Sequence, residues 1–131
     1  AWCMRVTRKS DIDEGETSAL EAMFNSISMT DFVERRKTGW KPFLLDVRSE
    51  GEFQQAHVVS TDLQITHESV LSMVDSIPND RDLLVFCRSG MRSQMAAMFL
   101  IRAGYDASSL YNLEGGIISW QSIAPEEIIR G

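Results

Sequence analysis

The chain has 131 residues, 44% of them apolar, which is enough for one globular domain with a substantial core. Its formal net charge of −6 argues against a general nucleic-acid surface, because phosphate contacts need clustered lysines and arginines. No apolar run approaches the ~20 residues of a membrane span and no signal-peptide pattern is present, so we expect a domain without membrane or nucleic-acid partners.

The N-terminal part of the chain carries no motif that indicates a function. Residues 11–17 are acidic and contain one glycine, and apolar residues recur at helical spacing within residues 20–27. We therefore expect residues 1–27 to form an arm that is flexible or packs on a partner. Residues 28–131 are expected to form the domain proper.

The domain is expected to open with a helix and a buried strand. A capping serine or threonine starts the helix, which ends before Gly39. The apolar residues 43–45 then indicate a central strand with Asp46 and Arg48 at its carboxyl end. A carboxylate at a strand end can hold a neighbouring loop through charge-assisted hydrogen bonds. We therefore interpret Asp46 and Arg48 as a supporting pair rather than as catalysts.

The middle of the chain combines a short extended stretch with a second helix. Residues 57–61 indicate a strand or an extended turn, and residues 67–77 indicate a helix that ends at Pro78. His57 and His67 share no close spacing with either cysteine, so no metal site is predicted.

The most informative stretch is a strand, a tight loop and a helix start around Cys87. The apolar residues 83–86 run directly into this cysteine, and a helical pattern begins after Ser93. Backbone N–H groups of the loop and of the first helical turn lack intrahelical partners, so they can converge on an anion above the sulfur. Arg88 and Arg92, together with the helix dipole, should lower the pKa of Cys87. We predict Cys87 as the catalytic nucleophile, with a substrate-binding loop of Arg88, Ser89, Gly90, Met91, Arg92 and Ser93.

The last third of the chain continues the alternation of helices and strands. A helix ends at Gly104, a strand follows at residues 109–113, and Gly115-Gly116 leads into a short helix that carries Trp120. Strands that alternate with helices of ~10 residues are typical of a parallel sheet covered on both faces, so we predict an α/β fold. The apolar face of the helix before Gly104 is predicted to contain Met95, Met98, Phe99 and Ala103.

Three ordered motifs resemble those of the rhodanese family of sulfurtransferases. They are residues 44–48 followed by Glu52-Phe53, residues 87–93, and residues 113–116 followed by Trp120. The resemblance spans roughly residues 29–121. It implies a rhodanese-like three-layer α/β fold, with a central, mainly parallel sheet of about five strands and helices on both faces. It also implies that Asp46 and Arg48 support the active loop.

The same resemblance implies a sulfurtransferase of the thiosulfate:cyanide type. Cys87 would attack the outer sulfur of a small anionic donor such as thiosulfate, hold a persulfide, and pass the sulfur to a thiophilic acceptor. The loop amides, Arg88 and Arg92 would stabilise the negative charge on the donor and on the persulfide. The cycle needs no cofactor besides the cysteine persulfide.

Two alternatives stay open at this stage. The chain begins with Ala1, which suits a sulfur-delivery domain of a larger enzyme that acts on a protein acceptor such as a ubiquitin-like carrier. A cysteine phosphatase also holds its substrate in a loop between a cysteine and an arginine. Only four residues separate Cys87 from Arg92, and this loop is shorter than that of the phosphatases.

The two cysteines bear on the cellular compartment. Cys3 and Cys87 lie far apart in the sequence and in different settings, so no disulfide is predicted. We therefore expect a reducing compartment, which a catalytic thiol also requires. The cytoplasm is the expected location, with an organelle as the alternative.

Overall fold

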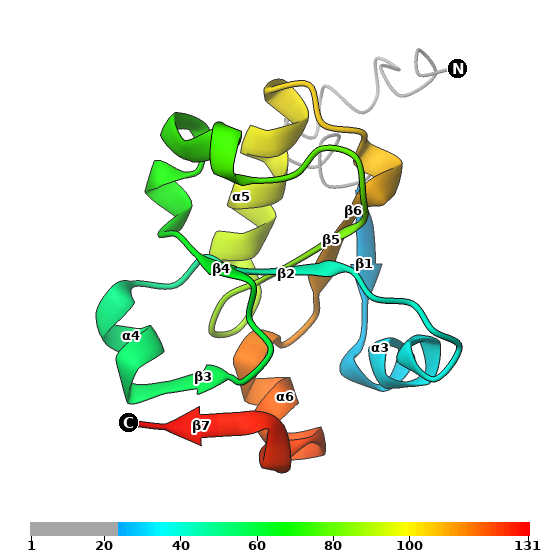
Figure 1. Cartoon of the computed structure of the whole chain (residues 1–131), viewed down its shortest axis with the longest axis vertical. Helices are drawn as coiled ribbons and strands as arrows, with labels where there is room; N and C mark the ends of the chain where they lie inside the picture. The colour runs from blue at the N-terminus through cyan, green and yellow to red at the C-terminus, as the bar shows by residue number, and fades with distance from the viewer. Residues whose placement is uncertain (1–23) are drawn as a thin grey trace, which may run out of the picture.

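Strands from five parts of the chain form one parallel sheet, as predicted. The computed structural model describes residues 24–131 (Figure 1). The strand order is β1-β6-β5-β2-β4, and every pair of neighbours is parallel. The strands of this sheet are β1 (Asn25–Ile27), β2 (Phe43–Asp46), β4 (Leu63–Gln64), β5 (Leu83–Phe86) and β6 (Leu110–Leu113).

Helices connect the strands, and a small second sheet lies outside the main one. In this second sheet β3 (Ala56–Val58) pairs antiparallel with β7 (Ile128–Arg130). Across residues 24–131, no helix has the length and apolar character required to span a membrane. The α-helices are α3 (Met29–Arg36), α4 (Glu50–Gln55), α5 (Met91–Arg102) and α6 (Gly116–Ile123). The 3₁₀ helices are η2 (His67–Ser69), η3 (Leu71–Ser76), η4 (Ala107–Ser109) and η5 (Pro125–Glu127).

The central strand β5 divides the core into two halves, because successive side chains of a strand point to opposite faces. Leu83 and Val85 belong to the half that contains α5 and the segment of η2 and η3. Leu84 and Phe86 belong to the other half, which contains α3 and α6. All four side chains are buried, as expected for a central strand that is covered on both faces.

The prediction of one regular helix over residues 67–77 is wrong. This stretch forms η2 and η3, with a break in helical geometry at Met73. Its polar side chains bond locally to the backbone; for example, the Ser72 hydroxyl donates to the Ser69 carbonyl oxygen at 2.9 Å. Such bonds compete with regular α-helical hydrogen bonds and favour short, irregular turns.

The long helix α5 was predicted correctly, but its buried face was predicted only in part. The face against the sheet contains Ser93, Ala96, Ala97 and Leu100, whereas the side chain of Met95 is 43% exposed. Small alanines at the centre of this face let the helix lie close to the strands. Of the four residues predicted for this face, Met98 and Phe99 are partly buried and pack against the core, whereas Met95 and Ala103 are exposed.

The start of the main sheet lies within the predicted arm. Residues 25–27 were expected to continue a helix, but they form the edge strand β1, which pairs with β6. Phe24 is also buried, in the core half that contains α5. The remaining part of that predicted helix, residues 20–23, and Cys3 lie outside the described residues.

Candidate active site

Cys87 lies at the carboxyl end of the central strand, in the position that the sequence predicted. It directly follows β5, and residues 88–90 connect it to the start of α5. Gly90 has a φ of +121°, a backbone conformation that side chains disfavour, and it provides the turn into the helix. The carboxyl ends of parallel strands are where open α/β sheets place their functional groups.

The loop surrounds the Cys87 sulfur with hydrogen-bond donors. The backbone N–H of Gly90 donates to Sγ at 3.0 Å, and the Ser93 hydroxyl lies 3.5 Å from it. Burial raises the pKa of the Cys87 thiol, but hydrogen bonds from Ser93 and from the amides of Gly90 and Ser89 outweigh burial and lower it. The pKa of Cys87 is therefore lowered, in the predicted direction. The main cause is hydrogen bonding within the loop rather than the charges of the two loop arginines.

Ser93 connects the sulfur to the neighbouring strand β6. Its hydroxyl contacts the Asn112 side-chain oxygen, the Gly90 carbonyl oxygen at 3.0 Å and the Cys87 sulfur. A hydroxyl has one proton and can donate it to only one of these acceptors at a time. Both polar side chains are buried.

Glu52, from α4, holds the guanidinium of Arg92. Two parallel hydrogen bonds of 2.7 and 2.9 Å join the two groups, a strong bidentate arrangement. The bond from Arg92 lowers the pKa of Glu52 to about 2, against the opposing effect of burial and with help from Ser49. Ser49 caps α4 and belongs to a capping box with Glu52. The cation predicted to bind the substrate is therefore engaged by a carboxylate of the protein.

Asp46 and Arg48 form a buried ion pair beside the loop, with exposed fractions of 0% and 4%. The Arg48 guanidinium donates to both Asp46 carboxylate oxygens, at 2.8 Å from Nη2 and 3.0 Å from Nε. Nη2 also donates to the Ala56 carbonyl oxygen at 2.8 Å, which connects the end of β2 to β3. Both side chains are thus used to hold neighbouring segments together, which is a structural role.

The first turn of α6 supports the loop from its other side. The backbone N–H groups of Ile117 and Ile118 donate to the carbonyl oxygens of Cys87 and Arg88 at 2.9 and 3.2 Å. Gly116 makes this approach possible, because a Cβ at this position would overlap both of those carbonyl oxygens. Its φ of +54° also disfavours a side chain.

Residues 28–123 match the family model described as "Rhodanese-like domain". The chain belongs to this family. A curated relative from Allochromatium vinosum, named "Sulfurtransferase", is 33% identical over 79% of this chain and 99% of its own length. A "Thiosulfate sulfurtransferase GlpE" from Pseudomonas savastanoi pv. phaseolicola is 31% identical over 67% of this chain and 80% of its own. A solved rhodanese-related protein from Thermoplasma volcanium superposes with a TM-score of 0.65 at 27% identity, covering 77% and 94% of the two chains.

Not all predicted substrate-binding residues of this rhodanese-like domain face the sulfur in the same way. Gly90 and Ser93 are buried against it, whereas Arg88, Ser89 and Met91 are exposed, Met91 at 75%. Met91 is the first residue of α5, and its side chain points into solvent. Which of these residues contact a substrate stays a prediction.

Sequence reasoning missed three contributors to the site. Asn112 could have been noticed as the one polar residue at the centre of an otherwise apolar strand, residues 110–113. Glu52 belongs to a quoted motif, but its partner lies 40 positions away and no local pattern pairs them. Gly116 was predicted only as part of a turn, and its contact with the loop depends on tertiary structure.

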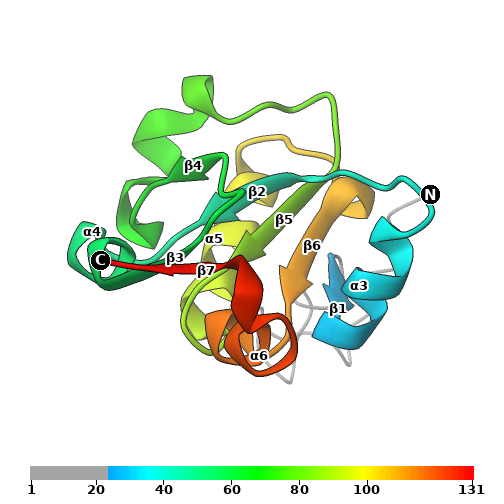
Figure 2. The ribbon, with the colours of Figure 1, turned by 60° about the horizontal axis from the view of Figure 1, so that its bottom comes forward.

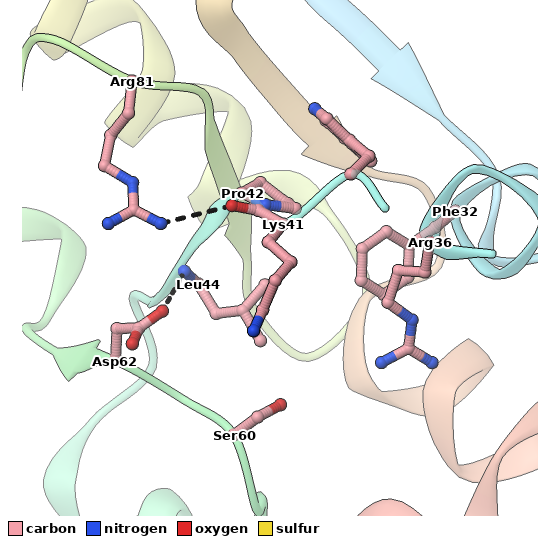
Figure 3. A pocket seen from close by; sticks show the side chains of 9 residues that line it. Phe32, Arg36, Lys41, Pro42, Leu44, Ser60, Asp62 and Arg81 are labelled. Carbon is pink, nitrogen blue, oxygen red and sulfur yellow. Dashed lines mark hydrogen bonds between the residues drawn. The ribbon is translucent and has the colours of Figure 1, made fainter. Parts of the chain in front are cut away.

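A larger pocket lies away from this site, near the amino ends of the strands (Figure 3). Its volume is about 440 Å³, and its lining includes Lys41, Asp62 and Arg81. There Arg81 donates to the Lys41 carbonyl oxygen, and the Asp62 carboxylate accepts from the Leu44 N–H. These contacts connect the segments that lead into β2, β4 and β5, and Cys87 does not line this pocket.

His57 was interpreted as structural, and its contacts agree with that interpretation. Its ring stacks on the Phe53 ring, with 4.1 Å between the ring centroids, and its Nδ1 lies 3.0 Å from the Phe53 carbonyl oxygen.

Within residues 24–131 no group of three or more His, Cys, Asp or Glu side chains is arranged to hold a metal ion.

Proposed function

We propose that this rhodanese-like domain is a sulfurtransferase that moves a sulfane sulfur from a small anionic donor, such as thiosulfate, through a persulfide on Cys87. The observation that carries the proposal is the buried Cys87 sulfur, which accepts a 3.0 Å hydrogen bond from Gly90 inside a short loop. The family and the names of the two curated relatives support the same activity.

In the first step, the Cys87 thiolate attacks the outer sulfur of thiosulfate. A bond forms between the two sulfurs, the S–S bond of thiosulfate breaks, and sulfite leaves with the bonding electron pair. The hydrogen bonds that lower the pKa of Cys87 favour its thiolate form, and an ionised Cys87 needs no separate general base. The loop amides stabilise the negative terminal sulfur of the resulting persulfide.

In the second step, an acceptor nucleophile attacks the terminal sulfur. The bond between this sulfur and Sγ breaks, and its electron pair returns to Cys87 as the thiolate. The cycle is a two-step, ping-pong reaction in which the cysteine persulfide is the sulfur carrier and no other cofactor takes part. The same loop donors stabilise the departing thiolate, because they already surround it before the donor arrives.

The cycle requires Cys87 as a free thiol, as it is in the structure. Our proposal therefore includes a reducing compartment such as the cytoplasm. A carrier protein in place of a small acceptor would use the same Cys87 persulfide and differ only in the second step.

Intact-mass spectrometry after incubation with thiosulfate tests the proposal. We expect the protein to gain one sulfur, about 32 Da, and to lose it when cyanide is added. The Cys87→Ser variant should show neither change while keeping its thermal unfolding temperature. Hydrolysis of an aryl phosphate without any sulfur adduct would instead assign the loop to phosphatase chemistry and refute the proposal.

A further inference from the structure

The hydroxyl of Ser93 has more acceptors within reach than protons to donate. In order of increasing distance, these acceptors are the Asn112 side-chain oxygen, the Gly90 carbonyl oxygen and the Cys87 sulfur. The acceptor that takes the single hydroxyl proton therefore determines whether the sulfur gains this hydrogen bond.

The Asn112 oxygen is the main competitor of the sulfur for this proton. It is the nearest of the three acceptors. Ser93 and Asn112 are 0% and 2% exposed, so solvent does not compete with either side chain. The Gly90 carbonyl oxygen is a weaker competitor, because it already accepts the N–H of Gln94 at 3.3 Å.

The parallel sheet brings Asn112 to this place. β6 pairs with β5 so that Asn112 is in register with Val85, two positions before the nucleophile Cys87. Figure 2 shows the two strands side by side, and α5, which carries Ser93, contacts both of them. A buried amide is unfavourable unless it is hydrogen-bonded, which favours the pairing of Asn112 with the hydroxyl.

The strength of the sulfur as an acceptor changes during the proposed reaction. As a thiolate, Sγ carries the negative charge, and hydrogen bonds to charged groups are the strong ones. In the persulfide the charge lies on the terminal sulfur, and Sγ is a weak, neutral acceptor. The preferred partner of the Ser93 proton is therefore Sγ in the first state and the Asn112 oxygen in the second.

We propose that Asn112 is a positioning residue that competes with the Cys87 sulfur for the Ser93 proton and accepts this proton while the protein carries the persulfide. The part that concerns the persulfide rests on the proposed function. When an acceptor attacks the terminal sulfur, the bond between this sulfur and Sγ breaks and its electron pair returns to Sγ. The hydroxyl then turns from Asn112 towards Sγ and keeps its proton throughout.

The charged groups beside the sulfur are the same in every variant that tests this competition. They are the two loop arginines and the three residues that form ion pairs next to them: Arg88, Arg92, Asp46, Arg48 and Glu52. Neither Ser93 nor Asn112 titrates, so substituting them leaves all of these charges in place. A change in the pH profile of Cys87 therefore reports a change in hydrogen bonding.

The pH profile of Cys87 alkylation by iodoacetamide measures the competition. Asn112→Leu removes the competing oxygen, so we expect the profile to shift to lower pH. Ser93→Ala removes the donor and should shift the profile to higher pH. The double variant should match Ser93→Ala alone, because Asn112 acts only through the hydroxyl. Tyr111→Phe is the matched control, since this neighbour on β6 packs in the other half of the core, and its profile should equal that of the wild type.

The rate of persulfide discharge by cyanide measures the second part. The protein is loaded with thiosulfate, excess donor is removed, and the loss of one sulfur is followed by intact-mass spectrometry. We expect faster discharge than in the wild type for Asn112→Leu and slower discharge for Ser93→Ala, because a thiolate of lower pKa is a better leaving group.

The variants are expected to fold. In Asn112→Leu the Ser93 hydroxyl keeps the Gly90 carbonyl oxygen and the sulfur as acceptors. Asn112→Ala removes the same oxygen with a smaller side chain, and it should shift the alkylation profile in the same direction. Thermal unfolding checks both variants.

The sign of the shift decides the inference. A shift to higher pH in the Asn112 variants would mean that Asn112 only supports the loop, and it would overturn the competition. An unchanged profile, or a double variant that differs from Ser93→Ala, would overturn it as well. A failure to load sulfur would contradict the proposed function alone, because alkylation of Cys87 does not depend on sulfur transfer.

Discussion

The ion pair between Glu52 and Arg92 makes a quantitative prediction about stability. Changing Glu52 to glutamine removes the charge but keeps a side-chain oxygen that can complete the capping box with Ser49. The pKa of Glu52 falls from its ordinary 4.5 to about 2, which at 1.36 kcal/mol per unit corresponds to an upper limit of roughly 3–4 kcal/mol. The two side chains are 31% and 30% exposed, so solvent screens the pair, and we expect a loss of about 1–2 kcal/mol at pH 7.

The pH dependence of this loss follows from the direction of the pKa shift. Because the folded pKa of Glu52 is depressed, its carboxylate stabilises the folded state fully above pH 4.5, and the contribution is lost as the pH falls towards 2. The difference in unfolding free energy between the wild type and Glu52→Gln should therefore shrink to less than half between pH 7 and about pH 3.

Urea denaturation at the two pH values measures this difference. Glu50→Gln is the matched control, since Glu50 lies in the same first turn of α4 but is exposed and has no ion pair among the described residues. We expect this control to change the unfolding free energy by less than about 0.5 kcal/mol. Equal stability of the wild type and Glu52→Gln at pH 7, or a gap of the same size at both pH values, would refute the reasoning.

Two further substitutions test how the loop is built. Ser93→Ala removes a hydrogen bond that lowers the pKa of Cys87, so this pKa should rise and the pH profile of alkylation by iodoacetamide should shift to higher pH. An unchanged profile would show that Ser93 does not donate to the sulfur. Gly116→Ala places a methyl group on the Cys87 and Arg88 carbonyl oxygens and should cost about 1–3 kcal/mol and most of the sulfur loading. Gly51→Ala is its control, because nothing lies within 4 Å of an added Cβ there, and equal thermal unfolding temperatures of the two variants would contradict the close approach of α6.

Local sequence patterns were sufficient to predict the centre of the site. The apolar run into Cys87 predicts β5, and the switch to helical spacing predicts α5, because both features depend only on neighbouring residues. The parallel sheet follows from the alternation of strands and helices. Asp46 and Arg48 were predicted as a structural pair for the same reason, since the two residues are nearly adjacent.

The residues that hold the loop depend on contacts that sequence spacing does not encode. Asn112 and Glu52 meet the loop only after the sheet has formed and brought β6 and α4 beside it. The edge strand β1 was missed because it is short and its pairing with β6 spans more than 80 positions of sequence. The centre of the buried face of α5 was missed because Ala96 and Ala97 are small and weakly apolar, so they contribute little to a hydrophobic pattern.

Three separate elements fix the active loop before any substrate binds. The first turn of α6 holds the carbonyl oxygens of Cys87 and Arg88, β6 holds Ser93 through Asn112, and α4 holds Arg92. A loop fixed from three directions needs little rearrangement when the sulfur is charged or discharged, which is the condition for electrostatic stabilisation of the thiolate.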